Sequence, residues 1–167
     1  MTQQTMSERE MYLGTFEAEY QTTLKILKAY PADQVDLKPG KAPNSARDII
    51  WTLVMSQMIV GPIITAPEIR NEDFPPAPKT LAELIGAFEN AHRDAATRVG
   101  AMSDDQFNGS LRMPVGPKQT ADVRRGQALW MMLMDTVHHR GQLSVYLRVC
   151  GAKLPSIYGP TLDEPWN

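Results

Sequence analysis

The stretch that decides the fold runs from Trp130 to Gly151 and reads WMMLMDTVHHRGQLSVYLRVCG. It is too apolar for a surface loop, and it ends at a glycine, the residue that commonly terminates a helix. Read as a helix, it places a set of residues on one face at alternating steps of three and four. These residues are Met132, Asp135, His139, Gln142, Tyr146 and Val149. The pattern predicts a long helix that turns this stripe toward the interior of a helical bundle.

Three earlier segments show the same helical periodicity, and each begins at a serine or threonine suited to cap a helix. They are 7–30 with Ser7, 45–63 with Ser45, and 80–102 with Thr80. Glu10 completes a capping box in the first segment. Gly61-Pro62 is expected to kink or end the second helix. The sequence therefore predicts four helices in all.

The connection at 103–120 has no periodic pattern, so we expect a long irregular link, after which Thr120 opens the last helix. No segment alternates clearly enough to predict a strand. The predicted fold class is therefore all-α, a four-helix bundle with a long connection before the last helix. The length suits a single domain, residues 1–167. The tail after Gly151 keeps aromatic side chains and is expected to pack on the body.

The composition bears on partners and location. The formal net charge is -2 and there is no basic run, so we expect no nucleic-acid partner. We also expect no membrane segment, because no apolar run reaches about 18 residues and the N-terminus lacks the apolar core of a signal peptide. A single cysteine, Cys150, excludes an intramolecular disulfide and fits a reducing compartment. Together these features predict a cytoplasmic protein.

Asp135 and His139 are the residues best placed to carry chemistry. Being four apart, they project from one face of a helix, which is the spacing by which one helix offers two ligands to a metal ion. A mixed nitrogen and oxygen donor set suits zinc, nickel, iron or manganese. A third ligand would have to come from another helix, and the candidates are Thr52, Ser56, Gln57 and His92.

A purely structural interpretation competes with metal binding. Burying a polar group without a partner costs about 1–3 kcal/mol. Asp135 could hydrogen-bond His139, while Gln142 and the hydroxyls of Thr52 and Ser56 complete a buried polar layer. The sequence alone leaves both interpretations open.

The remaining reactive side chains are expected to have structural roles. His138 lies about 100° round the helix from the stripe and should face solvent or an interface. His92 is expected at the boundary of the core, and Arg140 should pair with a carboxylate of a neighbouring helix. Cys150 has no activating neighbour on its face, so we expect an inert thiol.

With these residues in view, the chain resembles the DinB/YfiT-like superfamily of four-helix-bundle metalloenzymes. Three stretches carry the resemblance: residues 138–151, which begin HHRGQL, the tail KLPSIYGP at 153–160, and SARDIIWTLV at 45–54. The resemblance implies a homodimer and a divalent metal held by three histidines. It also implies thiol-dependent transferase or metal-dependent hydrolase chemistry.

The same resemblance places His139 at one of the three histidine positions, and it places Asp135 and Thr52 at the other two. One hypothesis is therefore a degenerate metal site, in which Asp135 and His139 hold the ion, Gln142 orients them, and Tyr146 with Thr52 shapes the pocket. The alternative is a metal-free protein that binds a small ligand or a partner with the same residues. The sequence assigns no catalytic residue.

Overall fold

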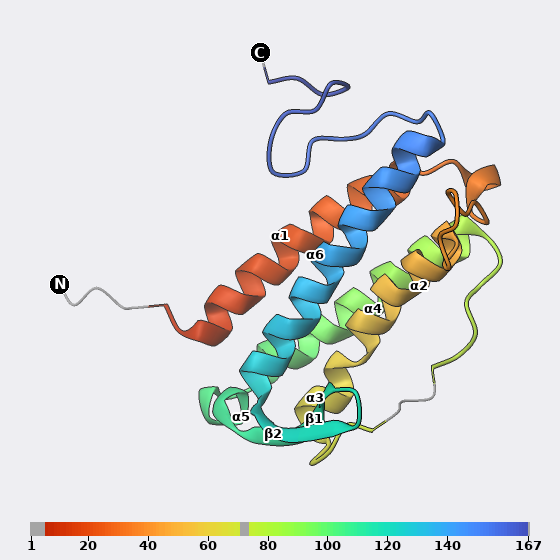
Figure 1. The fold of residues 1–167 in the computed structure, drawn as a ribbon. Helices are drawn as coiled ribbons and strands as arrows, with labels where there is room; N and C mark the ends of the chain where they lie inside the picture. The colour runs from red at the N-terminus through yellow and green to blue at the C-terminus, as the bar shows by residue number, and fades with distance from the viewer. Residues whose placement is uncertain (1–5, 71–73, 167) are drawn as a thin grey trace.

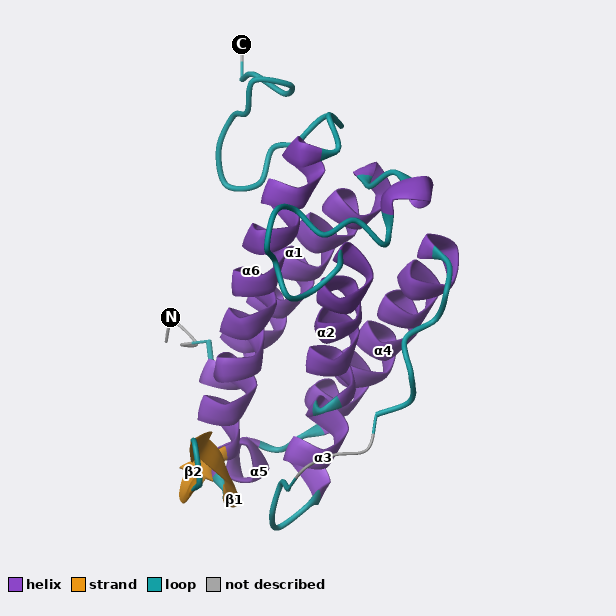
Figure 2. Cartoon of the chain, turned by 45° about the vertical axis from the view of Figure 1, so that its right-hand side comes forward, coloured by secondary structure: helices purple, strands orange, loops and turns teal. Residues whose placement is uncertain are grey.

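Four long helices make the body of the molecule in the computed structural model, which describes residues 6–70 and 74–166 (Figures 1 and 2). They are α1 (Glu8–Ala29), α2 (Ala46–Met58), α4 (Leu81–Ala101) and α6 (Arg125–Val149). α1 packs on α4 and α6, and α2 packs on the same two helices from the other side. The predicted four-helix bundle is confirmed.

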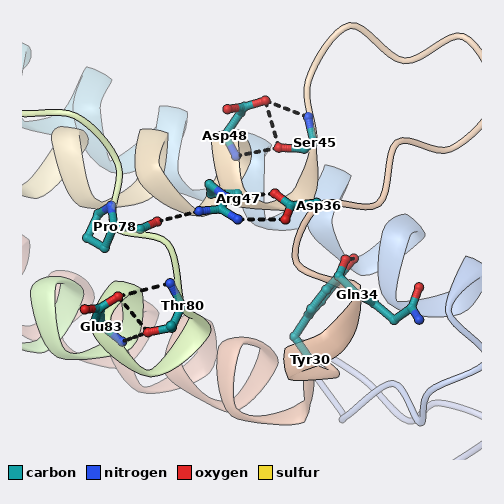
Figure 3. Close-up of polar contacts among 9 residues, drawn as sticks. All are labelled: Tyr30, Gln34, Asp36, Ser45, Arg47, Asp48, Pro78, Thr80 and Glu83. Carbon is teal, nitrogen blue, oxygen red and sulfur yellow. Dashed lines mark hydrogen bonds and ion pairs between the residues drawn. The ribbon is translucent and has the colours of Figure 1, made fainter.

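Local capping chemistry sets where these helices begin. Ser7, Ser45 and Thr80 each accept a hydrogen bond from the backbone N–H three residues later, and the acidic side chain at that later position accepts one from the backbone N–H of the cap residue. The boxes that open α2 and α4 lie at the same end of the bundle (Figure 3). There Arg47 donates to Asp36 at 2.7 Å and to the carbonyl of Pro78 at 3.1 Å, which ties both loops to the start of α2. The predicted starts of these three helices are confirmed.

The link after α4 differs from the prediction of an irregular loop. It contains a short helix, α5 (Asp104–Asn108), and a hairpin of β1 (Ser110–Gly116) and β2 (Gln119–Arg124). Leu111 is paired with Val123, and both side chains are buried under the end of the bundle. The expected helix start at Thr120 is therefore wrong, since that residue lies in β2 and α6 begins at Arg125.

The second helix breaks earlier than expected. α2 ends at Met58, and a separate short helix, α3 (Val60–Thr65), follows (Figure 1). Pro62 is tolerated in the first turn of α3, where a backbone N–H has no helical acceptor. Arg125 then donates to the carbonyl oxygens of Ile63 and Ala66 and satisfies the end of α3. Arg125 thus ties the end of α3 to the N-terminus of α6.

The α2–α3 segment also corrects the expectation that no run is apolar enough to span a bilayer. Within the 20 residues Ala46–Thr65, an 18-residue window has a mean hydropathy of 1.5, so the segment is long and apolar enough by length and composition alone. Half of that window is buried inside the protein. Core helices meet the same criterion, so this is weak evidence for a membrane helix.

Candidate functional site

Residues from α2 and α6 meet in the groove between these helices. The helices are antiparallel: Asn44 before α2 contacts Tyr146 near the end of α6, and Ser56 contacts Asp135 a few turns away. The Ser56 hydroxyl donates to Asp135 Oδ2 at 2.9 Å. One turn from this contact along each helix, Thr52 and His139 stand at the same level. The structure therefore brings Ser56, Asp135 and His139 together, with Thr52 one turn from Ser56 on α2.

Asp135 positions the imidazole of His139. Nδ1 of His139 lies 2.9 Å from the backbone carbonyl of Asp135 and 3.3 Å from its Oδ2. Because a carbonyl oxygen only accepts, Nδ1 carries a proton, and in the neutral ring the lone pair is then on Nε2. The side chains are partly open to solvent, with 38% of Asp135 and 19% of His139 exposed. The pair is thus fixed in orientation but accessible.

The order of these groups excludes one familiar mechanism. The carboxylate of Asp135 stands between the hydroxyl of Ser56 and the ring of His139. An activated serine needs the imidazole next to its hydroxyl, with the carboxylate on the far side of the ring. Ser56 is therefore not arranged as a nucleophile.

The donor set does not fit a three-histidine metal site. Thr52 stands where the resemblance expects the second-helix histidine, and its hydroxyl donates to the carbonyl of Asp48 at 3.0 Å within its own helix. Among the residues that the structure describes, no three His, Cys, Asp or Glu side chains are grouped to hold a metal ion. Asp135 and His139 are two strong donors, whereas a catalytic zinc site normally has three protein ligands.

Two cavities lie along the α2–α6 groove. The first has a volume of about 270 Å³ and is lined by Thr52, Met55, Ser56, Ile59, Phe74 and Met132. The second has a volume of about 320 Å³ and is lined by Ala42, Pro43, Asn44, Ile49, Gln142, Val145 and Tyr146. The four residues expected to shape a single pocket are therefore divided between two. Phe74 could not be identified from the sequence as a cavity residue, because it belongs to a proline-rich loop without periodicity.

The interior stripe of α6 is rotated from the predicted one. Five buried residues each follow a predicted stripe residue by one position: Leu133, Thr136, Arg140, Leu143 and Leu147. Gln142 is exposed and contacts His138 at 3.0 Å, so the expectation that Gln142 faces the interior is wrong. Val149 is exposed as well. The buried stripe could not be recognised from the sequence because a charged residue, Arg140, lies at its centre.

Arg140 is fully buried and joins α6 to α1. Its guanidinium lies 2.5 Å from Glu19 Oε2 and 3.3 Å from the Thr23 hydroxyl, and it also contacts the hydroxyl of Tyr158 in the tail. The predicted pairing with a carboxylate is confirmed, whereas its burial was not foreseen. This ion pair ties the buried stripe of α6 to α1.

His92 is also more buried than predicted, with 4% of the residue exposed. Its ring stacks on Tyr20 with centroids 3.7 Å apart, Nε2 lies 2.9 Å from Glu17, and Nδ1 lies 3.3 Å from Gln57. Burial lowers the pKa of His92, and the Glu17 carboxylate opposes this effect. His92 contacts α1 and α2 through these groups and does not complete a metal site with Asp135.

The fold and this site define a class of protein: a four-helix bundle with an acid–imidazole pair on its last helix. Residues 15–143, most of the chain, match the DinB superfamily, and the chain belongs to it. Uncharacterized protein YrdA of Bacillus subtilis (strain 168) is 24% identical over 157 residues, covering 92% of this chain and 89% of that protein.

Solved structures share the fold. A DinB-like protein from Bacillus cereus ATCC 10987 superposes with a TM-score of 0.72 at 16% identity, covering 89% of this chain and 97% of that one. YfiT from Bacillus subtilis, described as a probable metal-dependent hydrolase with an unusual four-helix bundle topology, gives 0.71 at 14% identity, covering 92% and 94%. At these identities the similarity establishes the fold alone.

Proposed function

We propose that this protein binds a small, mainly apolar molecule in the α2–α6 groove without a resident metal ion. The observation that carries the proposal is the 270 Å³ cavity between α2 and α6, whose lining is mostly methionine, isoleucine and phenylalanine. Its volume is near the lower end of the roughly 300–1,000 Å³ typical of ligand pockets. Methionine side chains adapt to ligand shape, so Met55 and Met132 suit a binding surface.

The polar groups at the cavity have partners within the protein. The Thr52 hydroxyl donates to the carbonyl of Asp48, and the Ser56 hydroxyl lies 3.0 Å from the carbonyl of Thr52 and 2.9 Å from Asp135. Because both hydroxyls already donate hydrogen bonds within the protein, they do not require a water molecule inside the cavity. An apolar guest can therefore enter without leaving a buried polar group unsatisfied.

Weak binding of a divalent cation by Asp135 and His139 is a second candidate function, and one observation favours it. Nδ1 of His139 bonds to a backbone carbonyl, which leaves Nε2 as the free nitrogen, the arrangement that metal-ligating imidazoles have. YfiT is described as a probable metal-dependent hydrolase. Against this candidate stands the threonine at the level where the third donor is needed.

Filling the cavity tests the ligand proposal. We expect n-hexanol at about ten times its Kd to raise the Tm of the wild type by about 3–6 °C. Met132→Trp, which places an indole in the cavity, should abolish this shift. Met134→Trp is the matched control, because Met134 is on the same helix and 64% exposed, and it should keep the shift. Ile59→Phe is a second cavity-filling variant. An unchanged Tm of the wild type, or an equal shift in both tryptophan variants, contradicts the proposal.

A further inference from the structure

We propose that the natural ligand of this site is a small apolar amine whose ammonium group binds Asp135, an inference that rests on the proposed function and names its ligand class. Asp135 is the carboxylate of the α2–α6 groove, and its ion-pair contact within the described chain is His139. No lysine or arginine lines either cavity in the described residues. A negative charge open to a cationic guest therefore stands at the edge of an apolar cavity.

The hydrogen-bond pattern of Asp135 leaves one oxygen for a ligand. The Ser56 hydroxyl and the His139 ring both contact Oδ2. Within residues 6–70 and 74–166, Oδ1 has no hydrogen-bond partner, and 38% of the side chain is exposed. A carboxylate has about four lone-pair positions, so Oδ1 can accept from an ammonium group without displacing either internal contact.

The cavity and the carboxylate are close enough to be used by one molecule. Ser56 lines the cavity and lies 2.9 Å from Asp135, and Met132, one helical turn before Asp135, lines it from the α6 side. The alkyl or aryl body of an amine would contact Met55, Ile59 and Phe74, and its nitrogen would lie toward Oδ1. A carboxylate or phosphate in the same place would face Asp135 with no cationic side chain in the lining.

Three probes of equal length test the ligand class: n-hexylamine, n-hexanol and hexanoate, titrated at pH 7 by calorimetry. We expect the amine to bind about tenfold tighter than the alcohol, because its hydrogen bond to the partly exposed carboxylate is charge-assisted, and hexanoate to bind weakest. Asp135→Asn should bring amine and alcohol affinities within about twofold of each other. Asp105→Asn removes an exposed carboxylate from α5 and should leave the wild-type order unchanged.

The outcomes separate this inference from the proposed function. Equal binding of amine and alcohol by the wild type would overturn the amine assignment and leave the apolar cavity supported. Binding of none of the three probes would overturn both proposals. Amine binding that survives in Met132→Trp would place the amine outside the cavity and would also overturn the inference. Because the order of the three probes is measured on the wild type, that comparison stays decisive even if a variant fails to fold.

Discussion

Arg140 shows at the scale of one residue why the site could be predicted only in part. The spacing of Asp135 and His139 was evident from the sequence, and the structure does place both side chains together. Which stripe of α6 is buried was not evident, because the buried stripe contains an arginine whose charge is balanced by Glu19, more than a hundred residues earlier. Burial of a charged side chain depends on such a distant partner.

The buried Arg140–Glu19 pair should therefore be costly to break. Arg140→Ala leaves Glu19 without its cation, and we expect the free energy of unfolding to fall by about 3–5 kcal/mol. Arg148→Ala removes a pair with Asp163 in which 40% of the arginine is exposed, and it should cost less than about 1 kcal/mol. Urea denaturation of both variants measures the difference, and equal losses would contradict this role for Arg140.

His92 should make stability depend on pH. Its pKa is lowered in the folded protein by burial, so the unfolded chain binds more protons once the pH falls below the ordinary value of 6.5. Stability is then complete above that value and declines as the pH falls toward the folded pKa. Each unit by which the pKa is lowered is worth about 1.4 kcal/mol.

The comparison of wild type with His92→Gln isolates this contribution. We expect the wild type to lose more stability than the variant between pH 7.5 and 5, measured by urea denaturation at each pH. Glu17, whose pKa is lowered by contacts with Gln21 and His92, contributes in the same direction at lower pH. Parallel pH profiles of the two proteins in this window would show that His92 does not titrate as described.

At the scale of elements, local signals were sufficient for the starts of α1, α2 and α4 and insufficient for the hairpin and for the start of α6. The capping boxes need only residues three apart, so sequence alone predicts them. The hairpin buries few side chains, among them Leu111, Met113 and Val123, and its strands also contain proline and charged residues. Such short alternation is stabilised by packing under the bundle, which no local pattern reveals.

Near the junction between the hairpin and α6, the backbone of Gly126 packs closely against the ring of Phe107. A Cβ added at Gly126 would lie 2.2 Å from the ring of Phe107, which is buried. Gly126→Ala should therefore cost about 2–3 kcal/mol, because the ring cannot move away without disturbing the core. Gly14→Ala is the control, since nothing lies within 4 Å of its Cβ on α1, and it should be neutral or stabilise by up to about 1 kcal/mol. Thermal denaturation of both variants measures these changes in stability. A Gly126→Ala variant as stable as the wild type would contradict the packing described.

At the scale of the whole molecule, the site exists only because distant segments meet. Ser56 and Asp135 are separated by 79 residues, and Phe74 reaches the cavity from the connection between α3 and α4. The four long helices were predictable from helical periodicity, and the bundle class from that periodicity together with the resemblance to the DinB/YfiT-like superfamily. The division of the groove into two cavities required the packing of α2 against α6, which depends on the rotation of both helices.

The central claim is that the α2–α6 groove lacks one donor for a metal ion and is a ligand cavity instead. Calorimetric titration of Zn²⁺ into the chelator-treated wild type, Thr52→His and Met58→His tests it most directly. Thr52→His adds an imidazole at the level of His139, whereas Met58→His adds one at an exposed position of the same helix. We predict no tight binding by the wild type or Met58→His, and an affinity at least about tenfold higher for Thr52→His. Tight, stoichiometric Zn²⁺ binding by the wild type that is lost in Asp135→Asn would contradict the account.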